Sequence, residues 1–114
     1  MNNTFLNPSL EALVTEIIAV NLAWKEAVEV GDHLSAIALS LAQLKTRLQV
    51  RLLHQYAPDR VYLQLDTENQ GLEGEALYGL ILRQPIANYW NAAHLPVRIA
   101  QKMLSSEELQ QFIN

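Results

Sequence analysis

Residues 33–55 read HLSAIALSLAQLKTRLQVRLLHQ, and this stretch decides the fold. Its apolar residues recur at helical spacing, which predicts a helix capped by Asp32 and stopped before Pro58. At 100° per residue these residues form two stripes on opposite sides of the helix. The first stripe contains Leu34, Ile37, Leu41, Leu44, Leu48 and Leu52, and the second contains Leu39, Ala42, Val50 and Leu53. The pattern predicts burial on two sides.

A second helix precedes this one. Asn7 is the predicted N-cap and Pro8 the first helical residue, with the helix running to about Val30 and ending at Gly31. A connection this short makes the two helices antiparallel neighbours, so residues 8–56 are predicted to form a helical hairpin. One stripe of the second helix can then pack on the first helix. The other stripe needs the C-terminal half of the chain or a second subunit.

Strands are predicted after the hairpin. Residues 60–66, RVYLQLD, alternate apolar and polar side chains, as a half-buried strand does. Residues 76–83, ALYGLILR, fit either the returning strand of a β-hairpin or a short buried helix, and the alternation of Tyr78, Leu80 and Leu82 favours the strand. We therefore expect a small β-hairpin over residues 60–83 that packs on the helices.

The tail, residues 85–113, is predicted to hold short helices. Pro85 and Pro96 each suit the first turn of a helix, and Ser105 with Glu108 forms a capping box before the last one. The predicted fold class is mainly α, with α+β as the alternative, in a single domain over residues 1–114.

The composition and the motifs of the sequence exclude several classes of function. The 114 residues carry a net charge of −4 and no cysteine, which excludes disulfides and thiolate chemistry. No basic segment followed by an apolar one begins the sequence, so we expect no signal peptide, no membrane anchor and a cytoplasmic location. The sequence contains no phosphate-binding loop, no dinucleotide fingerprint and no serine-nucleophile motif. We therefore assign no catalytic residue, no cofactor and no metal ligand.

The stretch DTENQGLEGE, residues 66–75, is the strongest candidate for a cation site. Asp66 and Gly71 match the first and sixth positions of an EF-hand loop, but the twelfth position, which needs a bidentate glutamate, is Leu77. The simpler interpretation is a solvated turn between strands. The alternative is a metal-binding protein or enzyme that uses the acidic side chains Asp66, Glu68, Glu73 and Glu75.

The C-terminal segment supports a third hypothesis. From residue 76 to residue 106 there is no acidic side chain, whereas Arg83, Arg98 and Lys102 lie there. Residues 85–113 can be arranged as a helix-turn-helix, which would make the protein a nucleic-acid-binding regulator. The negative net charge and the acidic start of the last helix argue against this interpretation.

One polar residue lies within the apolar arc of the first helix. A buried Asn21 needs a hydrogen-bond partner, because an unpaired amide costs roughly 1–3 kcal/mol. Such an Asn either fixes the register and partner number of packed helices or bonds to a nearby backbone group or water.

The surplus of apolar helix surface and the absence of catalytic motifs favour a non-enzymatic interaction module. We expect an adaptor, an assembly factor, or an inhibitor or immunity-type protein that binds a protein partner and self-associates through the helical hairpin. The residues expected at the interface are Leu39, Val50, Leu53, Tyr89, Trp90 and Arg98.

Overall fold

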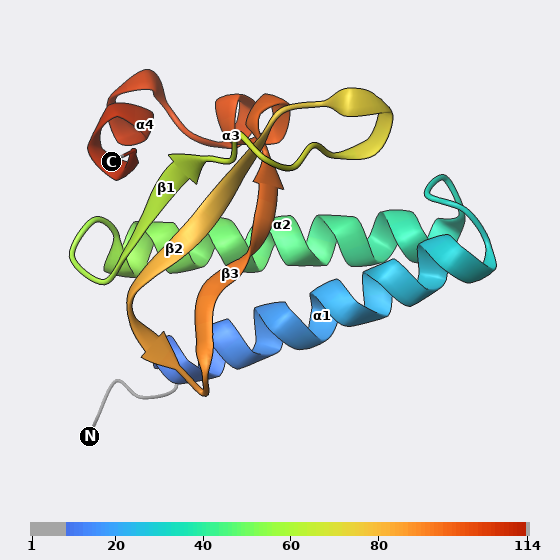
Figure 1. Cartoon of the computed structure of the whole chain (residues 1–114), viewed down its shortest axis with the longest axis horizontal. Helices are drawn as coiled ribbons and strands as arrows, with labels where there is room; N and C mark the ends of the chain where they lie inside the picture. Colours follow the sequence, from blue (N-terminus) through green and yellow to red (C-terminus); the bar gives the residue numbers. More distant parts are fainter. Residues whose placement is uncertain (1–8, 114) are drawn as a thin grey trace.

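A computed structural model describes residues 9–113 and shows an α+β fold (Figure 1). A helical hairpin comes first, followed by a three-stranded antiparallel sheet and short C-terminal helices. The elements are α1 (Leu10–Val30), α2 (Ala36–Tyr56), β1 (Val61–Leu65), a short 3-10 turn η1 (Leu72–Gly74), β2 (Leu77–Ile86), β3 (Tyr89–Pro96), α3 (Val97–Met103) and α4 (Ser106–Phe112). The predicted helical hairpin is confirmed, and so is the strand at residues 76–83.

Serines cap both long helices. The hydroxyl of Ser9 accepts a hydrogen bond from Ala12 N before α1, while the predicted cap Asn7 and Pro8 lie outside the described residues. The hydroxyl of Ser35 accepts from Ala38 N before α2, so the prediction of Asp32 as the cap is wrong. Asp32 instead accepts from Leu34 N within the connection, because its position is too far upstream to reach the first turn of α2.

The sheet is a meander in the order β1-β2-β3. Ala87 and Asn88 both adopt positive φ, 50° and 71°, and this pair forms the tight turn that a twisted β-hairpin requires. The chain therefore returns as β3, and the prediction of a helix opened by Pro85 is wrong. Local proline and helical spacing were outweighed by pairing with β2, in which Gly79 lies opposite His94.

The predictions for the end of the chain are largely confirmed. Pro96 directly precedes α3, and Ser105 and Glu108 form both hydrogen bonds of the predicted capping box at α4. Beyond α4, Ile113 forms a parallel bridge with Leu63. The C-terminal segment thereby covers part of the outer edge of β1, an edge that would otherwise offer unpaired backbone groups.

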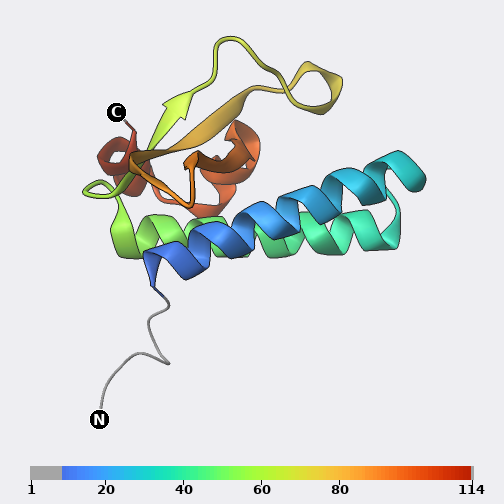
Figure 2. The ribbon, with the colours of Figure 1, turned by 60° about the horizontal axis from the view of Figure 1, so that its bottom comes forward.

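One face of the sheet packs on the helical hairpin to form the core. On α2, Leu48 and Leu52 from the first stripe and Val50 and Leu53 from the second are all buried, so two-sided burial holds for this part of the helix. The buried Gln49 amide donates to Ala92 O at 3.0 Å and His94 O at 3.1 Å, which satisfies carbonyls of the edge strand β3. The sheet covers only part of the hairpin, and the rest projects beyond it (Figure 2).

Candidate functional site

The helical hairpin has a covered half and a free end. The covered half comprises the first two turns of α1 and the last half of α2, where the side chains enter the core. The free end comprises the last turns of α1, the helix connection and the first turns of α2, which extend past the sheet (Figure 1). Large apolar side chains are exposed there, namely Leu22, Val30, Leu34, Ile37 and Leu39. Such a concentration of exposed apolar residues is typical of an interaction surface.

Charge is absent from the α2 side of the free end. Residues 34–44 contain no Asp, Glu, Lys, Arg or His, and Leu34, Ile37 and Leu39 are exposed within that segment. The α1 side carries Glu26 and Glu29 in its last turns. Depletion of charge at the centre with charges near the rim is the usual composition of a protein interface.

A buried lysine marks the boundary between the two halves. Lys45 is only 7% exposed, and its Nζ donates to Asn21 Oδ1 at 3.2 Å and lies 4.5 Å from the centre of the Trp24 ring. Burial lowers the pKa of Lys45 to about 8, and the Lys25 charge acts in the same direction. The Asn21 amide thus accepts from a side chain of the neighbouring helix and links α1 to α2 within one chain.

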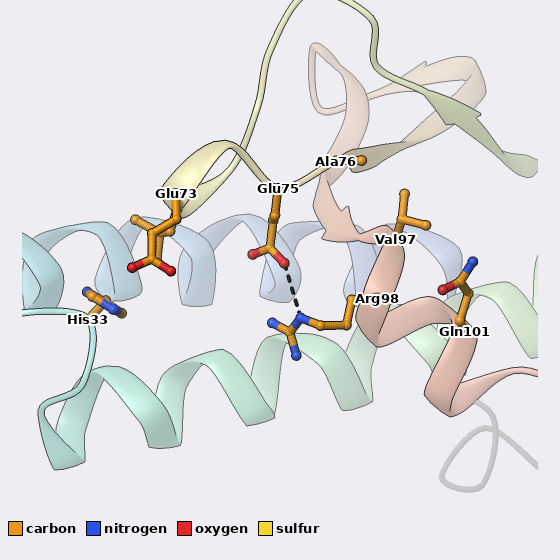
Figure 3. Close-up of a pocket in the computed structure, with 8 residues that line it drawn as sticks. His33, Glu73, Glu75, Ala76, Val97, Arg98 and Gln101 are labelled. Atoms are coloured by element: carbon orange, nitrogen blue, oxygen red, sulfur yellow. Dashed lines mark hydrogen bonds and ion pairs between the residues drawn. The ribbon is translucent and has the colours of Figure 1, made fainter.

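A groove of about 640 Å³ separates the loop after β1 from the free end (Figure 3). Glu73 from the loop and His33 from the helix connection face each other across it, and Arg98 Nε of α3 contacts Glu75 Oε1 at 3.3 Å. A Cβ at Gly71, at the base of the loop, would lie 2.9 Å from Leu77 Cδ2, so a larger residue there would require that side chain to shift. The loop forms one wall of the groove (Figure 3).

The same loop is held to the sheet by a histidine–carboxylate pair. His94 Nε2 of β3 lies 2.7 Å from Asp66 Oδ2. Asp66 Oδ1 accepts from Glu68 N and Asn69 N, and its Oδ2 also accepts from the Asn69 amide. The Glu68 N–H, then His94 and Asn69, hold the pKa of Asp66 well below its ordinary value.

A second pair of this kind ties α4 to α2. His54 Nε2 lies 2.9 Å from Glu108 Oε2, and the other carboxylate oxygen of Glu108 accepts from Ser105 N within the capping box. The Ser105 N–H is the main cause that lowers the pKa of Glu108. The two pairs differ in their surroundings. Asp66 and His94 both line one hollow, whereas Glu108 lines a hollow to which His54 does not contribute.

The structure places the residues expected at the interface in different parts of the molecule. Leu39 is exposed on the free end, but Val50 and Leu53 lie in the core of the chain's own fold and cannot contact a partner while that fold is intact. Tyr89 and Trp90 are exposed at the β2–β3 turn, near the start of α1 and away from the free end (Figure 1). Arg98 lines the groove.

The two alternative functions lose their main support. No group of three or more metal-ligating side chains converges among residues 9–113, and Asp66 is occupied by protein donors. The helix-turn-helix is wrong because residues 89–96 form a strand. Arg83 is also engaged, since its Nε donates to Pro58 O at 2.7 Å and its guanidinium stacks on Tyr62.

Sequence reasoning missed Lys45 and the Asp66–His94 pair. A signal existed for Lys45, because Leu41, Leu48 and Leu52 lie on its side of the helix at spacings of four, three and seven residues. Asp66 and His94 are 28 residues apart and meet through β2, so no local pattern relates them.

No family model, curated protein or solved structure matches this chain. No helix within residues 9–113 is long and apolar enough to cross a membrane. The fold and the site define a small α+β domain with exposed apolar side chains on its helical hairpin.

Proposed function

We propose that the protein is an interaction module that self-associates through the free end of its helical hairpin. The observation that carries the proposal is the exposure of Leu22, Val30, Leu34, Ile37 and Leu39 beyond the reach of the sheet. Burying such side chains contributes about 25 cal/mol for each Å² of apolar surface removed from water. The absence of cysteine is compatible with this role in a reducing cytoplasm.

A second copy of the chain fits the charge distribution of this surface. In a twofold dimer, a residue near the axis lies beside the same residue of the partner, so any charge there meets its own sign. The segment 34–44 of α2 has no charged side chain and can lie at the axis without this repulsion. Leu39, exposed within this segment, is the natural centre of such a contact.

Light scattering of the full chain over a concentration series tests the proposal. We expect a dimer mass at high concentration, and we expect Leu39→Glu to shift the protein to monomer by roughly tenfold or more in dissociation constant. Met103→Glu is the matched control, since Leu39 and Met103 are both 45% exposed and only Leu39 lies on the free end.

Two results would contradict the proposal. A wild-type protein that stays monomeric up to hundreds of micromolar has no self-association to explain. Equal effects of Leu39→Glu and Met103→Glu would show that the free end is not the contact. In either case the exposed apolar residues would need a different partner.

A further inference from the structure

The sheet face that points away from the helices contains a hollow of about 410 Å³. Leu63 and Leu80 point into the core, so the next residues along their strands, Gln64 and Gly79, point outward. Gln64, Gly79 and His94 form one row across the three strands. Gly79 has no side chain at the centre of this row, and a Cβ there would lie 3.2 Å from Ile81 Cδ1. The glycine therefore keeps the hollow open between Gln64 and His94.

The hydrogen bonds of Asp66 determine which nitrogen of His94 carries a proton. Ionised Asp66 is an acceptor only, so His94 Nε2, 2.7 Å away, must donate its N–H to it. In the neutral ring Nδ1 then has the lone pair, and Nδ1 forms no hydrogen bond with any residue in the described range 9–113. His94 lines the hollow with 42% of its side chain exposed. An oriented imidazole with an available lone pair is the arrangement of a general base.

The hollow also contains neutral hydrogen-bond donors. Asn91 Oδ1 accepts from Ala93 N at 3.1 Å, which orients the amide and leaves its NH₂ group to donate. The Gln64 amide and the Thr67 hydroxyl lie in the same lining. Donors of this type stabilise negative charge that develops on a carbonyl oxygen. The charged groups in the lining are Asp66, Glu68 and, when protonated, His94, so an anionic ligand is disfavoured.

We propose that His94 acts as a general base in this hollow and promotes the hydrolysis of small uncharged carboxylic esters. Nδ1 takes a proton from water as the water oxygen bonds to the ester carbonyl carbon. The bond from that carbon to the leaving alcohol oxygen then breaks, and the proton passes from Nδ1 to the leaving oxygen or to solvent. Asp66 is a positioning residue that keeps the proton on Nε2. This activity is separate from self-association, because the hollow lies on the sheet and not on the helical hairpin.

Release of p-nitrophenolate from p-nitrophenyl acetate by the full chain is the test. We expect His94→Gln to reduce the protein-dependent rate roughly tenfold or more. His33→Gln is the matched control, because His33 and His94 side chains are both 42% exposed but His33 has no part in the hollow. Circular dichroism of each variant confirms that it is folded. Equal rate losses in the two variants, or no loss in His94→Gln, would overturn the proposal and leave the pair as a structural link.

Asp66→Asn tests the positioning role. Its amide oxygen can still accept from Glu68 N and Asn69 N, but its NH₂ would donate to His94 Nε2 and force the ring proton onto Nδ1. We expect a loss of rate together with a change of tautomer in the ¹⁵N spectrum of His94. An active Asp66→Asn protein with the altered tautomer would contradict the mechanism.

Discussion

The covered half and the free end of the helical hairpin both carry large apolar side chains, but their surroundings differ. On α1, Leu13 is 1% exposed, whereas Leu22 is 55% exposed and lies on the opposite side of the helix. On α2, Leu53 is buried and Leu39 is exposed, although both belong to one stripe. The contrast teaches that burial here changes along the helix axis, because the sheet covers one half of the hairpin and ends before the other.

The largest effect on stability is expected for Leu53→Asp in the covered half, compared with Leu39→Asp on the free end. Leu53→Asp places a carboxylate in the core with no partner, and we expect it to destabilise the fold by about 5 kcal/mol, which unfolds a domain of this size. Leu39→Asp on the same stripe should leave the free energy of unfolding of the monomer nearly unchanged. Urea denaturation followed by circular dichroism measures both, and a folded Leu53→Asp protein would show that the covered half is not a core.

The next largest difference in stability is expected when two leucines of α1 are each truncated to alanine. Leu13→Ala should cost about 2–5 kcal/mol, because it leaves a cavity in packed surroundings. Leu22→Ala should cost less than about 0.5 kcal/mol in the monomer, because that side chain is in water. Similar costs at low protein concentration would mean that the free end is packed in the monomer.

The boundary lysine gives a smaller effect that depends on pH. The pKa of Lys45 is about 8 in the folded protein and 10.5 in the unfolded chain. Below pH 8 the amine is charged in both states, so the fold carries the full cost of burying the ammonium. From pH 8 to about 10.5 the folded state is neutral and the unfolded chain is charged, so the stability of the wild type rises with pH.

Lys45→Met removes this dependence. We expect the variant to be more stable at pH 7, by up to about 3 kcal/mol, with the advantage shrinking toward pH 10. The contacts of the ammonium with Asn21 and Trp24 offset part of the gain. Urea denaturation at several pH values measures it, and Lys102→Met is the control for an exposed lysine. A constant difference between wild type and Lys45→Met across this range would contradict the expectation.

The helix caps give the smallest contrast. Ser9→Ala, at the start of α1 in the covered half, should lower the free energy of unfolding by about 1 kcal/mol. Ser35→Ala, at the free end, should cost about half as much, because the first turn of α2 can open with little loss of core packing. Hydrogen exchange should show faster exchange only in that turn. Equal global losses would indicate that the free end unfolds together with the core.

The fold was predictable where local patterns agree with tertiary pairing. Three predictions that depend on near neighbours in sequence are confirmed. They are the helix expected over residues 33–55, observed as Ala36–Tyr56, the alternation in β1 and the Ser105 capping box. The strand β3 was missed because Ile86, Tyr89, Trp90 and Ala93 also fit a helix, and only pairing with β2 selects the strand. The candidate hollow was missed because its residues come from three strands and a loop.

By itself, the sequence determined that two long helices form an antiparallel hairpin and that one of them has apolar side chains on opposite sides. These features follow from backbone geometry over a few residues. Only the tertiary structure decided which of those side chains are buried, because that depends on where a three-stranded sheet ends above the hairpin. The same packing brought Asp66 to His94, since antiparallel pairing joins residues that are distant along the chain.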